Sequence, residues 1–96
     1  MNTYIVLMKL TDQGIRVVKE VPDHIEASIR SLEALDGKVV GFYATLGEYD
    51  YVACVEAPNE AIVMRFLLAF GAAGDVRTTT MKALSRNEFE EIARKL

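Results

Sequence analysis

The stretch KVVGFYATLGEYDYVACVE, residues 38–56, decides the fold of this 96-residue chain. Two runs rich in β-branched and aromatic residues, 38–46 and 49–56, are separated only by Gly47 and Glu48. Apolar runs joined by a glycine-containing pair are typical of a β-hairpin. The stretch therefore predicts two antiparallel strands with a tight turn between them.

A further strand is predicted near each end of the chain. Residues 3–10 (TYIVLMKL) are aliphatic and β-branched, and residues 76–84 (VRTTTMKAL) alternate around three threonines. Both compositions favour strands. The segment TDQG at 11–14 combines residues that favour turns, so it predicts a turn and a short connector after the first strand.

Two helices are predicted between these strands. Apolar residues at helical spacing indicate a helix that begins at Pro22 and Asp23, with Glu26 completing a variant of the capping box. Gly37 is expected to end this helix in the left-handed conformation. The second helix is expected over roughly 59–72.

A third, short helix is predicted at the C-terminus. Ser85 and Glu88 have the spacing of a capping box. Phe89, Ile92 and Leu96 follow on one side of the helix, and we expect them to face inward.

The order of these elements is β-α-β-β-α-β with an extra C-terminal helix. This order is typical of the ferredoxin-like, split βαβ arrangement, an α+β fold with a four-stranded antiparallel sheet. A chain of 96 residues is expected to form one domain, residues 1–96.

The predicted strands are apolar on both faces. Helices in this fold cover one face of the sheet, and the other face is normally solvated and polar. In three strands, alternation places apolar side chains on both faces. The two faces of each strand are Tyr4, Val6, Met8 and Leu10 and, opposite, Ile5 and Leu7; Val39, Gly41 and Tyr43 and, opposite, Val40, Phe42 and Leu46; and Tyr49, Tyr51, Ala53 and Val55 and, opposite, Val52 and Cys54. Because large exposed apolar faces are rare on monomers, we expect a second copy to cover this face, as a homodimer or higher homo-oligomer in the form of a dimeric α/β barrel. The alternative is that strand twist and the C-terminal helix cover it within one chain.

Composition excludes several function classes. The formal net charge of −3 argues against nucleic-acid binding, which needs a clustered basic face. Cys54 is the only cysteine, so an internal disulfide is excluded and a reducing, cytoplasmic location is expected. His24 is the only histidine, so we predict no metal site. No cofactor motif, signal peptide or membrane-spanning segment is recognisable, so no cofactor and no membrane partner are expected.

Four segments resemble the GYD-domain family: YIVLMKLTDQGI (4–15), GKVVGFYATLGEYDYV (37–52), VEAPNE (55–60) and GDVRTTTMKAL (74–84). Gly47, Glu48, Tyr49 and Asp50 match the segment that names the family. The resemblance implies the dimeric α/β-barrel fold and brings no established reaction. Ala44 departs from the family, whose members often carry a bulky aromatic residue there.

Polar residues at the strand ends form a candidate ligand site near the hairpin. Around an apolar cavity, such residues can bind a small polar-aromatic or acidic metabolite. The candidates are Lys9, Thr11, Gln13, Tyr43, Tyr49, Asp50 and Arg77. We therefore predict a homo-oligomeric domain that binds a small molecule.

Two alternatives remain open at this point. The first is a small cofactor-independent enzyme of the isomerase or monooxygenase type, with Asp50 or His24 as the base and Tyr49 as a hydrogen-bond donor. The second is a structural oligomer without a ligand. In that case Asp50 bonds the backbone of its own turn, and His24 lies exposed in the first turn of a helix.

Overall fold

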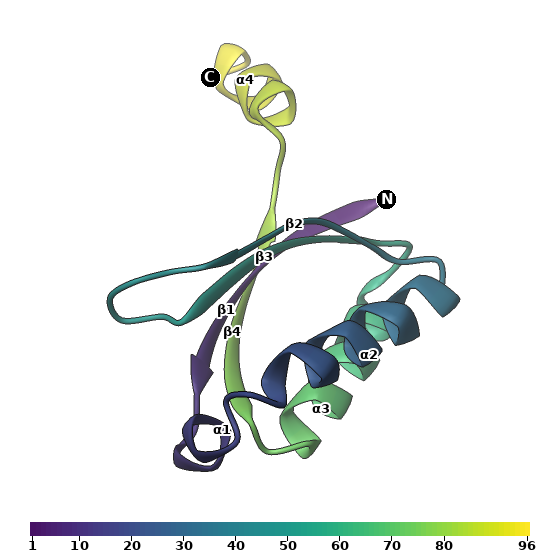
Figure 1. The fold of residues 1–96 in the computed structure, drawn as a ribbon. Helices are drawn as coiled ribbons and strands as arrows, with labels where there is room; N and C mark the ends of the chain where they lie inside the picture. Colours follow the sequence, from purple (N-terminus) through teal and green to yellow (C-terminus); the bar gives the residue numbers. More distant parts are fainter.

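The computed structural model describes residues 1–96 as one antiparallel sheet with helices (Figure 1). The elements are β1 (Asn2–Leu10), α1 (Asp12–Arg16), α2 (Val21–Ala34), β2 (Lys38–Ala44), β3 (Tyr51–Ala57), α3 (Glu60–Ala72), β4 (Val76–Ala83) and α4 (Arg86–Arg94). The strand order is β2-β3-β1-β4, with every neighbouring pair antiparallel. This is the α+β, ferredoxin-like fold that the sequence predicts.

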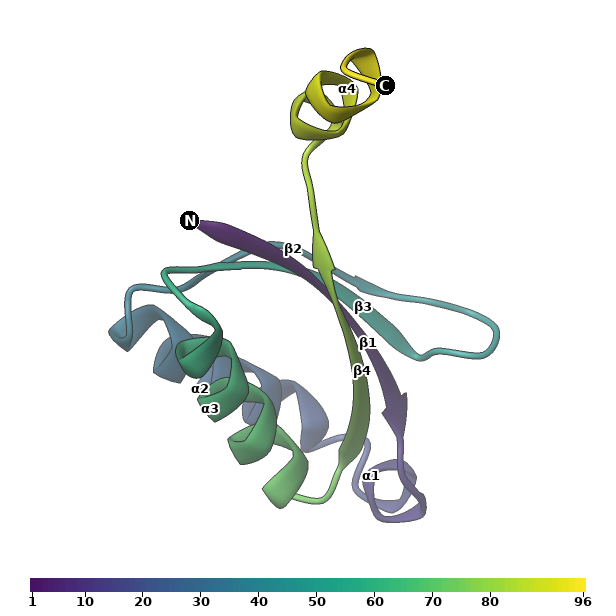
Figure 2. The ribbon, with the colours of Figure 1, turned by 180° about the vertical axis from the view of Figure 1, so that it is seen from behind.

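Helices α2 and α3 cover one face of the sheet (Figures 1 and 2). The core lies between these layers, where Val6 and Val55 of the sheet and Leu32 of α2 are fully buried. Phe66 and Phe70 of α3 pack edge to face, with ring centroids 5.7 Å apart. Burial of these apolar side chains is the main force that holds α2 and α3 to the sheet.

The other face of the sheet has no helix over it, and we call it the open face. Its register aligns two rows of side chains across all four strands: Gly41, Cys54, Ile5 and Met81 in one row, and Tyr43, Val52, Leu7 and Thr79 in the next. Tyr43 is 67% exposed and Met81 is 47% exposed. The two rows are mostly apolar, as the sequence predicts.

One part of the predicted face assignment is wrong. The β2–β3 register shifts between Val39 and Gly41, so Val40 forms a bulge. Val39 and Phe42 both pack against the helix-covered core, while Tyr43 lies on the open face. Simple alternation fails here because a bulge inserts one residue and reverses every side chain that follows it.

The connection between β1 and α2 also differs from the prediction. TDQG belongs to a short helix, α1, rather than a turn, and Thr11 caps it by accepting from the amide of Gly14 at 3.0 Å. Helix α2 begins at Val21, after Glu20, so Asp23 lies inside the first turn instead of at the cap. At the other end, Asp36 and not Gly37 has the positive φ, 65°.

The hairpin connection is longer than predicted. Strand β2 ends at Ala44 and β3 begins at Tyr51, which leaves residues 45–50 as the loop. Thr45 closes this loop, because its amide donates to the carbonyl of Asp50 at 2.8 Å and its hydroxyl donates to the carbonyl of Tyr49 at 2.5 Å. Gly47 at the tip has φ 109°, a conformation that favours glycine.

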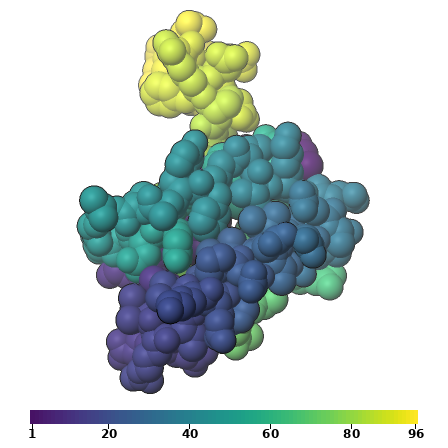
Figure 3. Space-filling view, viewed as in Figure 1, coloured from purple at the N-terminus to yellow at the C-terminus, as the bar shows by residue number.

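Helix α4 stands away from the rest of the molecule (Figures 1 and 3). Its capping box is formed as predicted, and the hydrogen bonds from the backbone and side chain of Ser85 hold the pKa of Glu88 below its ordinary value of 4.5. The predicted inward packing is wrong, because Phe89 and Ile92 are 62% and 55% exposed and Leu96 is fully exposed. The two-residue link after β4 holds the helix beyond the sheet, where no core of this chain reaches it.

Candidate functional site

The end of β1 is held on both sides by aspartates. The amide of Leu10 donates to Oδ2 of Asp50 at 2.8 Å, and the amide of Thr11 donates to the backbone carbonyl of Asp75 at 2.9 Å. Asp50 precedes β3 and Asp75 precedes β4, the two neighbours of β1. Consecutive amides of one strand end are thereby fixed between two loops, and this brings the candidate polar residues to one end of the sheet.

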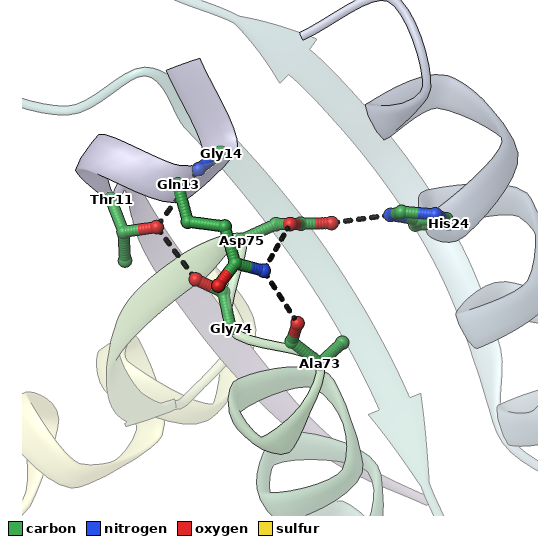
Figure 4. Close-up of polar contacts among 7 residues, drawn as sticks. All are labelled: Thr11, Gln13, Gly14, His24, Ala73, Gly74 and Asp75. Atoms are coloured by element: carbon green, nitrogen blue, oxygen red, sulfur yellow. Dashed lines mark hydrogen bonds and ion pairs between the residues drawn. The ribbon is translucent and has the colours of Figure 1, made fainter. Parts of the chain in front are cut away.

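Asp75 is the centre of a buried polar cluster at this end (Figure 4). The residue is 2% exposed, and its carboxylate oxygens are contacted by Nδ1 of His24 and, at 3.3 Å, by Nε2 of Gln13. The same Gln13 amide also donates to the carbonyl of Ala73 at 3.2 Å. A buried carboxylate needs such partners, because an unpaired one carries a large desolvation penalty.

Local sequence explains why the cluster forms. Thr11 donates its hydroxyl to the carbonyl of Gly74 at 2.6 Å, which joins the start of α1 to the loop before β4. Gly14 allows the close approach, because a Cβ there would lie 2.1 Å from the backbone oxygen of Asp75. Gly74 has φ 89°, and the turn it makes places Asp75 between α1 and α2.

The contact between His24 and Asp75 defines the tautomer of the imidazole. A carboxylate only accepts, so Nδ1 carries the proton and Nε2 is left without a partner in this chain. The His24 side chain is 46% exposed, so solvent reaches the ring. An imidazole oriented by a carboxylate in this way is suited to accept a proton or to donate a hydrogen bond.

A second group of candidate residues lies at the hairpin end. Nζ of Lys9 is 5.7 Å from the ring centroid of Tyr49 and 4.0 Å from a carboxylate oxygen of Glu48. Lys9 lies directly opposite Arg77 in the β1–β4 register, and Arg77 makes no ion pair within the chain. The two backbone positions are therefore neighbours beside the apolar rows, but the guanidinium group of Arg77 lies next to Gly71 of α3.

Asp50 also acts on its sequence neighbour. The pKa of Tyr51 is raised above its ordinary value of 10.0 by burial and, to a smaller extent, by the carboxylate of Asp50. The ring of Tyr51 packs against Phe42 with centroids 5.5 Å apart. The same Asp50 carboxylate accepts from the backbone of β1 and not, as the sequence alternative had it, from the amides of its own turn.

The structure divides the predicted site residues into groups. Thr11 and Gln13 join His24 around Asp75, and Lys9 joins Tyr49 and Asp50 near the hairpin. Tyr43 lies apart on β2.

Two hollows lie elsewhere on the surface. A hollow of about 310 Å³ lies between α2 and α3, around Ser31 and Arg65. A larger one of about 820 Å³ lies between α3 and β4, and Arg77, Thr78 and Thr80 contribute to its wall. Of the predicted site residues, only Arg77 lines either of these two hollows.

Asp75 is the one residue of the cluster that the sequence interpretation missed. Its partner His24 lies 51 positions away, and its partner Gln13 lies 62 positions away. In the sequence, Asp75 stands between Gly74 and a predicted strand. An aspartate is common at such a turn, so its position gave no sign of burial. Only the tertiary fold shows that this carboxylate is buried.

Two observations concern the whole chain. No group of three or more His, Cys, Asp or Glu side chains is placed to hold a metal ion. None of the helices has both the length and the apolar character needed to cross a membrane.

Known proteins of similar sequence and structure are consistent with this fold. A protein of Thermus thermophilus named "Glutamine synthetase and cystathionine beta-lyase binding protein" is 41% identical over 85 residues, which cover 88% of this chain and 90% of that protein. The crystal structure of TTHA0845, also from Thermus thermophilus, has a TM-score of 0.57 at 22% identity, and covers 88% of this chain and 95% of its own.

The leucine response regulatory protein LrpA of Mycobacterium tuberculosis has a TM-score of 0.56 at 20% identity, over 88% of this chain and 51% of its own. At such identities the two solved structures show the fold alone. The family described as "GYD domain" matches residues 4–93, nearly the whole chain. The chain belongs to the GYD-domain family.

Proposed function

We propose that this chain is a self-associating binding protein whose partners are enzymes of amino-acid metabolism. The support from sequence is the Thermus relative, which is named for binding glutamine synthetase and cystathionine β-lyase and matches over most of both chains. In this proposal, the chain likewise binds enzymes of amino-acid metabolism. The lone Cys54 supports a reducing, cytoplasmic location for these encounters.

The observation that carries the proposal is the open face. Ile5, Leu7 and Val52 form its apolar centre, and no helix of the same chain lies over them. An apolar face of this kind is characteristic of a protein-binding surface. The same face serves self-association, with the open faces of two copies packed together, and its periphery remains for enzyme partners.

Self-association is tested by sedimentation equilibrium and native mass spectrometry of the purified chain. We expect a dimer or a multiple of it at micromolar concentration. Leu7→Glu places a charge in the centre of the open face and is expected to give monomers. Glu91→Gln on α4, far from that centre, is the control and should leave the assembly unchanged. A monomeric wild-type chain would contradict the proposal.

Enzyme binding is tested with purified proteins. Glutamine synthetase and cystathionine β-lyase from Thermus thermophilus are titrated against the immobilised chain in biolayer interferometry, with serum albumin as the control. Saturable binding of either enzyme, absent for albumin, is the expected result. If neither enzyme binds at concentrations up to about 100 μM, a range in which even transient complexes are detected, this part of the proposal is refuted.

A small acidic metabolite is a second candidate partner, and the position of Lys9 beside Tyr49 favours it. The ammonium group of Lys9 lies beside the ring of Tyr49 at the hairpin end, an arrangement suited to a carboxylate and an apolar or aromatic body. L-Glutamate titrated in isothermal calorimetry is the probe. Lys9→Met should remove its binding, whereas Lys19→Met, in the connector before α2, should not. Absence of saturable binding at millimolar concentration would reject this ligand.

The oriented imidazole of His24 favours the alternative of a small cofactor-independent enzyme. Because His24 is the only histidine, its reaction with diethyl pyrocarbonate reports on one group. An imidazole poised as a base should react faster than N-acetylhistidine, and Asp75→Asn should reduce that rate. A rate at or below that of N-acetylhistidine would leave the His24–Asp75 pair with a structural role.

A further inference from the structure

Helix α4 carries an apolar stripe that this chain does not cover. Phe89 and Ile92 lie on one side of the helix and are 62% and 55% exposed, and Leu84 before the helix is 54% exposed. Figures 1 and 2 show α4 beyond the sheet, on the side away from α2 and α3. A helix with one apolar side is stable in water mainly when that side packs against something.

The rest of α4 is built to hold a helix in place. The capping box of Ser85 and Glu88 satisfies its first turn. Glu90 accepts from Arg86 at 2.8 Å and from Arg94 at 3.3 Å, so ion pairs link successive turns of the helix. These local bonds stabilise the nine residues of α4 as a helix, so its apolar side chains stay on one side of it.

The open face needs a further element to form a stable interface. Its two apolar rows across four strands cover a flat area of roughly 300 Å², given about 4.8 Å between strands. Stable interfaces bury about 800 Å² of each partner. The apolar rows by themselves therefore supply less than half of such an interface, and α4 carries further apolar side chains that are free to add to it.

The sheet order indicates where α4 meets a second copy. The unpaired edges of the sheet are β2 and β4, and such edges are free to contact another chain. When two open faces pack about a two-fold axis parallel to the strands, β4 of one copy lies over β2 of the other. Helix α4 continues from β4, so in this arrangement it lies next to the partner's β2 edge.

The β2 edge offers apolar contacts. Val40 at the bulge is 45% exposed and Tyr43 is 67% exposed, and both belong to this edge strand. We propose that α4 of each copy is a clasp, which packs Phe89 and Ile92 against the β2 edge of a second copy around Val40 and Tyr43. This clasp rests on the self-association proposed above, and it adds that the C-terminal helix completes the dimer reciprocally.

Matched variants of α4 test the clasp. The double variant F89Q/I92Q removes the stripe, while N87Q/E91Q makes the same number of changes on the opposite side of the helix. Glutamine is a good helix former in both. In sedimentation equilibrium, F89Q/I92Q should weaken dimerisation about tenfold or more and N87Q/E91Q less than about twofold, because only the first removes buried apolar area. Circular dichroism checks that α4 remains helical in both.

The outcomes separate the clasp from self-association itself. A dimeric wild type with F89Q/I92Q equally dimeric would overturn the clasp and leave self-association standing. A monomeric wild type would overturn both. The position of the contact is tested by photo-crosslinking with Phe89→p-benzoylphenylalanine in a mixture of ¹⁴N- and ¹⁵N-labelled chains. Mixed-label crosslinks to residues 38–44 support the clasp, whereas crosslinks to α2 or α3, or within one chain, contradict it.

Discussion

The imidazole of His24 on α2 contacts the carboxylate of Asp75, which lies 51 positions further along the chain and is 2% exposed. This contact ties the first main helix to the loop before the edge strand β4. Gln13 contacts the second oxygen of the same carboxylate. One buried charge therefore connects α1, α2 and β4, and its energetic role is open to direct measurement.

We predict that His24→Ala lowers the free energy of unfolding by about 1–3 kcal/mol, because it removes one partner of a buried carboxylate. Arg30→Ala, which breaks an exposed pair with Glu26, is the control and should cost less than about 0.5 kcal/mol. Urea denaturation measures both. Equal effects of the two variants would show that the His24–Asp75 contact adds no more than a surface pair.

Asp50 provides a second test at the end of β1. Asp50→Ala should cost about 1–2 kcal/mol, because the amide of Leu10 loses its acceptor. Asp50→Asn keeps an acceptor oxygen in the same place and should cost clearly less. Urea denaturation of both variants, with Glu48→Ala as the exposed neighbour, measures the difference. If the alanine variant is as stable as the wild type, the bond to β1 contributes nothing.

Two glycines should respond to alanine in opposite directions. Gly14→Ala puts a Cβ 2.1 Å from the backbone oxygen of Asp75, so it should destabilise the chain by more than about 2 kcal/mol. Gly71→Ala meets nothing closer than Arg77 at 4.0 Å inside helix α3, so it should stabilise by about 0.5–1 kcal/mol. Thermal unfolding of both variants measures the contrast. A tolerated Gly14→Ala would contradict the close packing of α1 on the loop before β4.

The raised pKa of Tyr51 predicts that the stability of the fold depends on pH in the alkaline range. Its pKa is raised above 10.0 in the folded chain, so the stability it contributes is fully present below pH 10.0 and is lost as pH rises through the raised value. Absorbance titration, with Tyr51→Phe to isolate its signal, measures the shift. Asp50→Asn should lower the pKa of Tyr51 and leave the larger effect of burial. An unchanged titration in Asp50→Asn would show that the carboxylate has no influence.

Most of the fold follows from local pattern. Both strands of the hairpin, the terminal strands and helix α3 lie within one or two residues of their predicted bounds, except that the hairpin loop is longer. The bulge at Val40 escaped prediction, because a single inserted residue leaves no compositional signal. Helix α1 escaped as well, because its five residues include Asp and Gly, which are common in turns.

The sequence by itself determined the strand and helix order, the apolar character of both sheet faces and the cap of α4, since each depends on residues close together in the chain. The tertiary structure alone decided that Asp75 is buried against His24 and Gln13, and that Asp50 bonds β1. It also decided that the stripe of α4 has no cover within this chain. These features depend on which segments the sheet order brings together, and contacts between distant residues leave no periodic signal in a single sequence.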